Sequence, residues 1–399
     1  MNETRERLAL LRGQVREWTA DILPYAAELE RDPGTVLRMV DLPLLAGAAT
    51  SQIPREYAPA PLVIGGERFD LRSALERVVF FEEGARADAG LLLSVPGPDM
   101  AGSLVDALGD RPQKDWFYGR LLERPTWTCF AMTESERGSD ATSMATSLTP
   151  SSGDDCLVLG GGKRFVGNAV RAGIAVVFAR MSPGPLGIRA VLVDTATPGF
   201  SAEPIPTVGL RAIQLGAITL DAVRVPGEHL LGRHLPAIRQ GMWGWLRTFN
   251  LWRTVIAAMG VGVAAAAHAY VLEERRTPSR RVQEQLDVMD QRIRSARQLT
   301  HRAARAVDAD PSDGALACAA KLAASRLADR ATQEALSLMG GGARLEHPRL
   351  DKMARDAQGL EFMEGTSNLQ RLSVFNDVMR GGGRPHGIAA PSGERPVGT

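Results

Sequence analysis

The carboxyl group of Glu364 is the first candidate for chemistry in this sequence. It lies in the segment Phe362-Met-Glu-Gly-Thr-Ser-Asn-Leu-Gln-Arg371, where a loop passes into a helical pattern. Thr366 or Ser367 is the expected N-cap of that helix. A carboxylate just before the cap can project into a cleft, where burial raises its pKa toward the working range of a general base. The ordinary interpretation of a lone glutamate there is a first-turn charge that interacts with the helix dipole.

A second set of polar groups is expected at the end of a strand, at Met132 and Thr133. Backbone N–H groups and one hydroxyl in that place suit the polar edge of a planar ring. The residues Gly138-Ser139-Asp140 that follow predict a tight turn, in which glycine permits close approach and Ser139 supplies a donor. An ordinary strand-to-strand turn, stabilised by Asp140 bonding to its own backbone, explains the same residues.

Two helical regions flank a central region of short strands. No helix-length segment separates these strands, so the pattern predicts a β domain of antiparallel type. The later helical segments are long enough for a four-helix bundle. The predicted helices cover residues 6–31 with a break or kink at Pro24, 35–45, 71–95, 100–122, 235–276, 281–308, 313–339 and 363–380. The predicted strands cover residues 156–159, 174–178, 188–193 and 218–225, and a Pro/Gly-rich break covers 53–66.

The order of these segments predicts an α+β protein with three domains. We expect an N-terminal helical domain at residues 1–125, a middle β-barrel or β-sandwich domain at 126–232 and a C-terminal helical bundle at 233–380. The Gly/Pro-rich segment 381–399 is expected to be a disordered tail. Pro112, after Asp110, predicts the start of one helix in the first domain.

The composition indicates a cytoplasmic protein without a nucleic-acid or membrane partner. The formal net charge is +1, so no overall field attracts polyanions. Cys129, Cys156 and Cys318 are scattered, which is typical of a reducing compartment. The apolar stretch at residues 254–267 is shorter than the roughly 20 residues of a membrane span and predicts a buried helix. Of the 47 basic residues, all but four are arginine; the lysines are Lys114, Lys163, Lys321 and Lys352.

Five segments resemble those of the acyl-CoA dehydrogenase family, in the family's order and spacing. They are Phe130-Ala-Met-Thr-Glu-Ser-Glu-Arg-Gly-Ser-Asp140, Gly161-Gly-Lys-Arg-Phe-Val-Gly-Asn168, Gly209-Leu-Arg211 with Asp221-Ala-Val-Arg-Val-Pro226, Met353-Ala-Arg-Asp356, and the Glu364 segment. The resemblance runs from about residue 53 to 380. It implies the family's three-domain fold, FAD as cofactor, and a homo-oligomer (dimer or tetramer) whose FAD sites are shared between subunits.

The resemblance implies a role for Glu364 as the base that removes a proton alpha to a thioester carbonyl. The enolate charge is then stabilised by the base's own backbone N–H and a flavin ribityl hydroxyl, and the β-hydrogen leaves as hydride to flavin N5. Some relatives carry the base immediately before a pocket arginine, which Arg253 matches. Trp252 stands there in this chain and cannot accept a proton. Arg253 is expected to hold Glu364 or balance charge beside the flavin, unless it is a solvent-facing helix residue.

The resemblance also assigns cofactor and substrate contacts. The implied FAD-binding residues are Phe130, Met132, Thr133, Gly138, Ser139, Phe165, Gly167, Arg275, Gly340, Gly341 and Thr366. The implied substrate-binding residues are Ser139, Asn250, Trp252, Arg253 and Gly365.

Four positions depart from the family pattern. Gly167 replaces a threonine whose hydroxyl reaches flavin N5, which should alter the redox tuning or open room beside the ring. Asn250 replaces an aspartate, which removes a negative charge near the pocket. Pro278 and Ser337 replace a phenylalanine and a glutamine in segments expected near the FAD phosphates.

Three tryptophans, Trp243, Trp245 and Trp252, lie close together in the sequence. Packing in the bundle core is one explanation. The other is that Trp252, and with it Trp245, narrows the acyl pocket toward a short or compact acyl group, because large aromatic side chains fill volume that a long chain needs.

The expected function is therefore α,β-dehydrogenation of an acyl thioester carried by coenzyme A or an acyl carrier protein. The acceptor of the electrons is expected to be an electron-transfer flavoprotein, and family analogy suggests a specialised biosynthetic pathway. The alternatives are a flavin-dependent monooxygenase, an acyl-CoA oxidase and a non-catalytic scaffold on the same fold. Glu364 argues against the monooxygenase, whereas Gly167 argues weakly for it.

Overall fold

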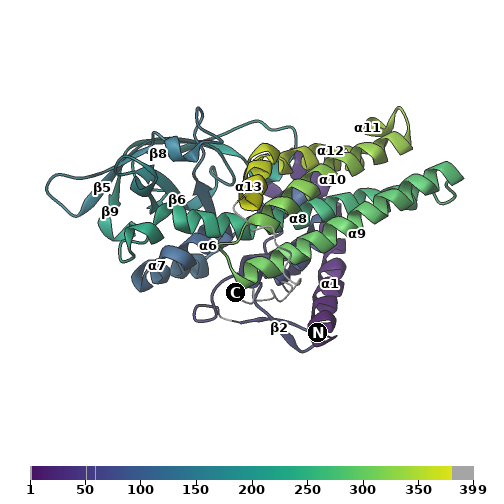
Figure 1. Cartoon of the computed structure of the whole chain (residues 1–399), viewed down its shortest axis with the longest axis horizontal. Coiled ribbons are helices and arrows are strands. Elements are labelled where there is room, and N and C mark those ends of the chain that lie inside the picture. The colour runs from purple at the N-terminus through teal and green to yellow at the C-terminus, as the bar shows by residue number, and fades with distance from the viewer. Residues whose placement is uncertain (1, 51, 59, 380–399) are drawn as a thin grey trace, which may run out of the picture.

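A sheet domain forms one end of the molecule and long helices form the other (Figure 1). The computed structural model describes residues 2–50, 52–58 and 60–379. The tail expected at residues 381–399 lies outside the described residues.

The N-terminal helices follow the expected break at Pro24. Helix α1 (Asn2–Ile22) is followed by a 3-10 turn (Leu23–Tyr25) and α2 (Ala26–Arg31), which confirms the break. The helix expected at residues 35–45 is wrong. A 3-10 helix (Pro33–Arg38) and α3 (Pro43–Thr50) occupy this region instead, because a proline at position 43 fits the start of a helix and not its interior.

The break expected at residues 53–66 contains a strand of a small hairpin. Strands β1 (Leu62–Ile64) and β2 (Glu67–Phe69) pair through Gly65 and Gly66, which both have positive φ. Four helices follow: α4 (Ala74–Ala85), α5 (Ala89–Leu92), α6 (Asp99–Leu108) and α7 (Arg111–Glu123). The expected start of α7 is confirmed, because Asp110 and Gln113 form a capping box with Pro112 in the first turn.

The central domain is a mixed sheet. Its strands are β3 (Trp127–Ala131), β4 (Ser147–Pro150), β5 (Cys156–Val166), β6 (Ala172–Arg180), β7 (Ile188–Asp194), β8 (Phe200–Pro204) and β9 (Gly216–Pro226). The order is β3-β6-β4-β5-β9-β8, with β7 paired to β6. The prediction of an antiparallel domain was wrong at β6, which pairs in parallel with β3 and, at one residue pair, with β4. The chain between β3 and β6 includes β4 and β5, which make a long crossover possible without a helix.

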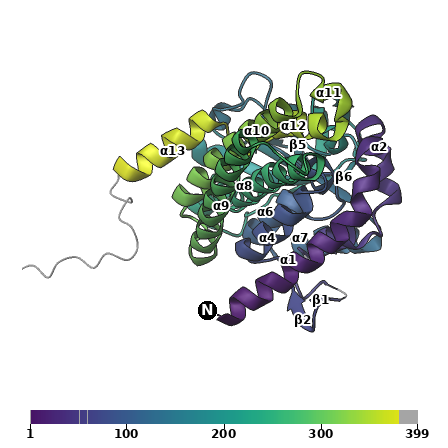
Figure 2. The ribbon, with the colours of Figure 1, turned by 90° about the vertical axis from the view of Figure 1, so that its right-hand side faces the viewer.

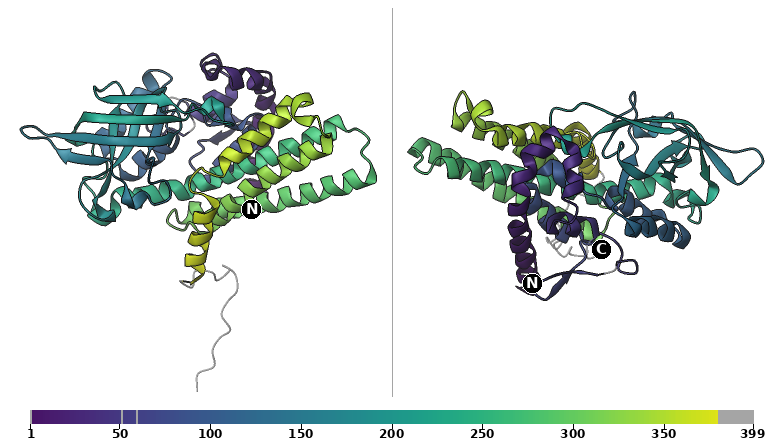
Figure 3. Two further views of the ribbon diagram at one scale, coloured as in Figure 1. Left: turned by 90° about the horizontal axis from the view of Figure 1, so that it is seen from above. Right: turned by 180° about the vertical axis from the view of Figure 1, so that it is seen from behind.

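The C-terminal helices are α8 (Gly241–Glu274), α9 (Arg280–Ala309), α10 (Ala315–Met339), the short α11 (Ala343–Glu346), α12 (Pro348–Leu360) and α13 (Ser367–Met379). The expected last helix, 363–380, begins four residues later than predicted, and α12 was not predicted. Glu364 and Gly365 have φ of 49° and 98°, so a right-handed helix cannot continue through them. Helix α13 therefore turns away from α12, as Figures 2 and 3 show.

Helix α8 is the core of the helical end. By length and composition it is the one helix among the described residues that could cross a membrane, yet most of its apolar window is buried inside the protein. It packs against α4, α9 and α10. This confirms the buried helix expected at residues 254–267.

Candidate active site

The turn between α12 and α13 carries Glu364. A positive φ is uncommon for a glutamate and occurs where the surroundings hold the backbone in place. The next residue, Gly365, also has a positive φ, which favours glycine. A Cβ at Gly365 would lie 2.9 Å from Nε2 of Gln370. The backbone of this turn is therefore fixed by packing as well as by hydrogen bonds.

Side chains from two helices hold the carbonyl group of Glu364. Arg253 on α8 donates from Nε at 3.2 Å, and Gln370 on α13 donates from Nε2 at 2.9 Å. The same Nε2 atom lies 2.9 Å from the carbonyl oxygen of Gly365. Arg253 and Gln370 are both buried. The interpretation of Arg253 as a solvent-facing arginine was thus wrong.

Lys321 on α10 holds the same turn from a third side. Its Nζ donates to the carbonyl oxygens of Glu361 at 2.7 Å and Gly365 at 2.8 Å. The carboxylate of Glu361 accepts from the backbone N–H of Ser367 at 2.7 Å and from its hydroxyl at 2.6 Å. Glu361, and not a side chain at the expected cap position, therefore satisfies the first N–H of α13.

The carboxylate of Glu364 has different surroundings from its backbone carbonyl, which accepts two hydrogen bonds. Its residue is only 9% exposed, and no described residue gives its carboxylate oxygens a hydrogen bond or an ion pair. Burial raises the pKa of Glu364 to about 7, while Lys321 and Arg253 oppose the rise and Asp99 adds to it. A carboxylate with a pKa near neutrality can accept a proton at physiological pH.

Asp99 is a second carboxylate of this site that the sequence did not reveal. It begins α6 with a φ of 45° and is half-buried. Burial raises its pKa to about 6, against the hydrogen bond from Met100 and the positive charge of Arg77. The only sequence signal is Asp99 after Pro-Gly-Pro at a helix start, which is also typical of an ordinary first-turn charge.

The side chain of Asn250 is fully engaged by the protein. Its Oδ1 accepts from Nη1 of Arg253 at 2.9 Å, and its Nδ2 lies 3.1 Å from Pro311 O and 3.3 Å from Ser312 O. The residue has no exposed surface. An aspartate could not donate to these two carbonyl groups. The expected contact of Asn250 with substrate stays a prediction, and within the described residues its Oδ1 contacts Arg253.

Trp252 is packed into the protein interior. It is 2% exposed, its Nε1 donates to Ser103 Oγ on α6 at 3.0 Å, and its ring lies edge-on to Phe81 at 6.0 Å. Trp243 and Trp245 are half-buried beside a separate apolar cluster. Trp243 and Trp245 thus pack beside the apolar core, and Trp252 fills the space between α8 and α6.

Contacts between aromatic rings link the sheet to Glu364. Phe130 on β3 lies 6.0 Å from Phe249 on α8, and the guanidinium of Arg253 lies 5.7 Å from the Phe249 ring. Arg253 in turn donates to the carbonyl of Glu364. A chain of contacts through Phe249 and Arg253 on α8 thus connects β3 with the Glu364 turn.

Thr133 and Phe165 lie side by side at that end of the sheet. The backbone N–H of residue 164 donates to Thr133 O at 2.8 Å, and the carbonyl of Met132 accepts from the buried Nζ of Lys163 at 3.0 Å. Phe165 has a φ of 59° and is 53% exposed. An aromatic face this exposed, beside a half-buried threonine, offers an apolar surface for a planar ring.

The turn at Gly138 and Ser139 is exposed. The nearest atom to a Cβ at Gly138 would be Thr133 Cγ2 at 4.0 Å, and the φ of Gly138 is not positive. The folded chain itself therefore does not require glycine there. Asp140 accepts from the hydroxyls of Thr142 and Ser143, as expected of a structural turn residue.

The space beside Gly167 is already filled. A Cβ at this position would lie 2.8 Å from Cδ1 of Ile213. The loss of the family's threonine therefore does not open room at this position, because an isoleucine from another loop occupies it. The expected change in hydrogen bonding near the flavin stays a prediction.

Three of the expected cofactor residues lie elsewhere in the chain. Gly340 and Gly341 end α10, about 28 Å along the helix from Lys321 by helical rise, and Arg275 ends α8. Within residues 2–50, 52–58 and 60–379, no atom outside the adjoining residues lies within 4 Å of a Cβ on either glycine, so their backbone is open to a ligand.

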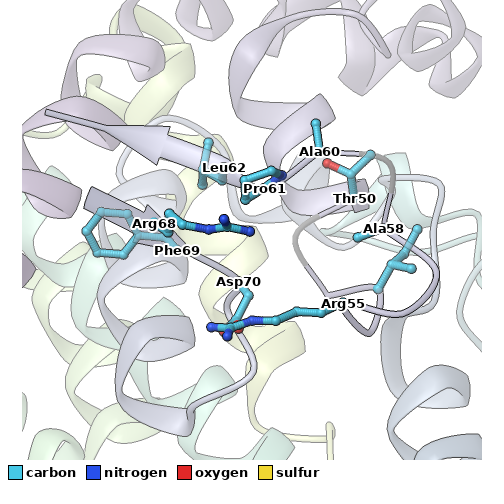
Figure 4. Close-up of a pocket in the computed structure, with 10 residues that line it drawn as sticks. Thr50, Arg55, Ala58, Ala60, Pro61, Leu62, Arg68, Phe69 and Asp70 are labelled. Carbon is cyan, nitrogen blue, oxygen red and sulfur yellow. The ribbon is translucent and has the colours of Figure 1, made fainter. Parts of the chain in front are cut away.

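A separate cleft lies between α3 and the β1–β2 hairpin (Figure 4). Arg55 crosses it and donates to Asp70 at 2.8 Å. It contains none of the residues expected to bind cofactor or substrate: its lining is Thr50, Ile53, Arg55, Ala58, Ala60, Pro61, Leu62, Arg68, Phe69 and Asp70.

Comparisons with known proteins agree with this arrangement. Residues 129–223 match the middle domain of acyl-CoA dehydrogenases, and residues 239–379 match their C-terminal domain. The mitochondrial short-chain specific acyl-CoA dehydrogenase of Mus musculus is 30% identical over 395 residues, which cover 95% of this chain and 91% of the relative. The chain belongs to the acyl-CoA dehydrogenase family. It is an oxidoreductase acting on CH–CH groups, as its homologues are.

Two solved structures show the same fold. Glutaryl-CoA dehydrogenase of Mycobacterium smegmatis in complex with FADH2 has a TM-score of 0.79 at 23% identity, covering 94% of this chain and 95% of that one. The prolyl acyl carrier protein oxidase AnaB has a TM-score of 0.80 at 20% identity, covering 93% and 98%. The cofactor is FAD, on which the homologues depend. The exposed Phe165 ring beside Thr133 and the open backbone at Gly340 and Gly341 fit this group.

Proposed function

We propose that this acyl-CoA dehydrogenase family member removes an α-proton from an acyl thioester with the carboxylate of Glu364. The observation that carries the proposal is a buried carboxylate with a pKa of about 7 and no donor from the described residues on its oxygens. Such a group is poorly solvated, which strengthens it as a base toward a weak carbon acid. FAD, when bound, supplies the acceptor for the β-hydrogen as hydride.

The groups around Glu364 position it and stabilise the charge that develops in the proposed reaction. Neither the indole of Trp252 nor the guanidinium of Arg253 offers a proton acceptor, so neither competes as the base. The backbone carbonyl of Glu364 is held by Arg253 and Gln370, which fixes the direction of the peptide. The backbone N–H of the same residue is the proposed donor to the thioester oxygen, where charge develops during proton removal.

We propose a short or compact acyl group as substrate. Trp252 is locked by Ser103 and Phe81 in the space between α8 and α6, and it lies next to Arg253 in the sequence. An indole ring that cannot swing away limits the volume available for an acyl chain. Replacing Trp252 with alanine should raise the preference for a six-carbon over a four-carbon thioester by about 10-fold. Trp252→Phe is the matched control, and an unchanged preference in the alanine variant contradicts the idea.

The proposal also covers the thioester carrier, the electron acceptor and the oligomeric state. Relatives and neighbours act on coenzyme A esters by name, whereas AnaB is named for an acyl carrier protein, and both carriers present the same thioester arm. We propose an electron-transfer flavoprotein as acceptor, a cytoplasmic location and a biosynthetic role. We propose a homo-oligomer in which two subunits complete each FAD site, because the implied FAD-binding residues Gly340 and Arg275 lie at the C-terminal ends of the long helices α10 and α8.

The deciding experiment is anaerobic bleaching of the flavin by short acyl-CoA esters and acyl-carrier-protein thioesters. The wild-type holoenzyme should bleach with at least one of them, and Glu364→Gln should slow bleaching by about 10²–10⁴-fold while keeping its flavin. Bleaching by one carrier class only would identify the carrier. Equal rates in wild type and Glu364→Gln would remove Glu364 from the reaction.

An oxidase is the second candidate, because AnaB carries that name on the same fold. Ile213 fills the space beside Gly167, which argues against an extra opening for oxygen at that position. Mixing the reduced enzyme with air-saturated buffer separates the two activities. Reoxidation in minutes or longer supports the dehydrogenase, and reoxidation within a turnover supports the oxidase.

A further inference from the structure

Lysine is rare in this chain, and three of its four lysines are buried. Lys163 pairs with Glu134 at 2.9 Å, and Lys352 pairs with Asp88 and Asp356. Lys321 is completely buried but makes no ion pair within 4.0 Å among the described residues. Burying an ammonium group without a carboxylate partner costs free energy, so the presence of a lysine at this position calls for an explanation.

The two acceptors of Lys321 are the backbone carbonyls of Glu361 and Gly365, which stand on either side of Glu364. A compact ammonium group can donate to both at 2.7–2.8 Å within a closed space. Its position, 44 residues before Gly365 in the sequence, is fixed by the packing of α10 against α12 and α13.

The charges that reach this turn come from several elements. The titratable and charged groups that face Glu364 and Lys321 are Asp99 on α6, Arg253 on α8, Cys318 on α10 and Glu361 in the turn itself. Arg253 and Lys321 are the two cations near Glu364, and both donate only to neutral oxygen atoms. No contacting carboxylate neutralises either charge, so both act on Glu364, and Lys321 has the larger effect of the two.

We infer that Lys321 is a positioning residue, which holds the Glu364 turn and supplies the positive charge that keeps Glu364 ionised at the working pH. This inference rests on the proposed function of Glu364 as base. Burial also lowers the pKa of Lys321 to about 8, against the opposing effects of Glu361 and Glu364. The ammonium group is therefore charged over the range in which Glu364 titrates.

The test measures proton removal without hydride transfer. Acetyl pantetheine has α-hydrogens but no β-carbon, so its exchange with D₂O on the holoenzyme reports on the base alone. Exchange is followed by NMR as a function of pH in wild type, Lys321→Gln, Lys321→Met and Lys321→Arg. Ser325→Ala is the matched control, because Ser325 is buried one turn further along α10 and lies outside the machinery. Glu364→Gln gives the uncatalysed baseline.

Loss of the charge should move the midpoint of exchange to higher pH by roughly one unit. At pH values below the midpoint this lowers the rate by about 10-fold. Lys321→Gln keeps a hydrogen-bond donor and Lys321→Met keeps none, so a shift in both assigns the effect to charge. Lys321→Arg should restore the wild-type midpoint at a reduced rate, and Ser325→Ala should keep it.

The opposite results are equally clear. A wild-type midpoint in Lys321→Gln, with or without a lower rate, overturns the electrostatic role and leaves only a structural clamp. If Lys321→Met does not fold, Lys321→Gln and Lys321→Arg decide. If the wild-type protein does not exceed the Glu364→Gln baseline, the proposed function fails, whatever the Lys321 variants do.

Discussion

The buried charged groups at the two ends of helix α12 differ in whether they form ion pairs. Near its start, Nζ of Lys352 lies 2.9 Å from Asp88 and 2.6 Å from Asp356. Just beyond its end, Lys321 and Glu364 are both buried, and no described residue forms an ion pair with either. The first end is an ion-pair cluster in which every charge has a partner. The second is a turn in which the charges are left unpaired.

The pKa values follow this difference. Burial by itself lowers the pKa of Lys352, but Asp88 and Asp356 together raise it above its usual range. At the other end, burial lowers the pKa of Lys321 to about 8 and raises that of Glu364 to about 7. Groups with perturbed pKa values near neutrality are the ones that can exchange protons with a substrate. The paired end therefore holds the fold, and the unpaired end is suited to chemistry.

Asp356 shows what the paired end holds. Its Oδ1 accepts from the backbone N–H of Leu210 at 2.6 Å, which ties the loop before β9 to α12. A Cβ on Gly209 would lie 2.2 Å from the carbonyl oxygen of Arg355, so the loop packs directly on the helix. Two of the family-like segments are thus in contact for a structural reason.

Breaking the paired end should have the largest effect on stability. Lys352→Met leaves Asp88 and Asp356 buried without their cation, which should cost about 3–5 kcal/mol of unfolding free energy. Urea denaturation measures this, and the pH midpoint of α-proton exchange should not move in the folded protein. Lys114→Met is the matched control, since Lys114 is half-buried, and should change stability by about 0.5 kcal/mol or less. Equal losses in both variants would contradict the comparison.

The raised pKa of Glu364, at the unpaired end, should make the free energy of unfolding depend on pH. The pKa of Glu364 is about 7 in the folded protein and 4.5 as the ordinary value, so between these pH values only the unfolded chain loses the proton. Stability contributed by this group is thus lost as pH rises from about 4.5 to 7. Glu364→Gln removes this loss. The unfolding free energy of the variant, relative to that of wild type, should therefore rise by up to about 3 kcal/mol between pH 5 and pH 8. A constant difference across this range would contradict the raised pKa.

Local patterns predicted the parts of the fold that depend on neighbours in sequence. The break at Pro24, the start of α7 and the loop-to-helix position of Glu364 rest on a few adjacent residues. Helix α12 was absent from the predicted helices, whose ranges end at residue 339 and resume at residue 363. The parallel pairing of β3 with β6 was also missed, since it joins strands with two others between them.

The site was predictable in its signature residues and not in their partners. Glu364 and Arg253 were named from the segments that carry them, whereas Lys321, Gln370 and Asp99 were not. Lys321 meets the turn only because α10 packs against α12 and α13, and Asp99 comes from another domain. Such contacts leave no periodic signal. The one available clue was a lysine in a chain that otherwise uses arginine.

Alanine substitutions at Gly66 and Gly365 should give the smallest difference in stability. They separate the strain of a left-handed backbone from the loss of the hydrogen bonds that hold the Glu364 turn. Gly66 and Gly365 both have positive φ, but only the second has a neighbour, Nε2 of Gln370, within 3 Å of a Cβ. Gly66→Ala should cost about 1–2 kcal/mol from the left-handed backbone alone. Gly365→Ala should cost roughly 1 kcal/mol more, because Gln370 must move and release the carbonyls of Glu364 and Gly365. Only Gly365→Ala should also slow α-proton exchange. If both alanine variants lose the same stability and keep the wild-type rate, the turn is held by its backbone alone, and the donors around it have no part in placing the base.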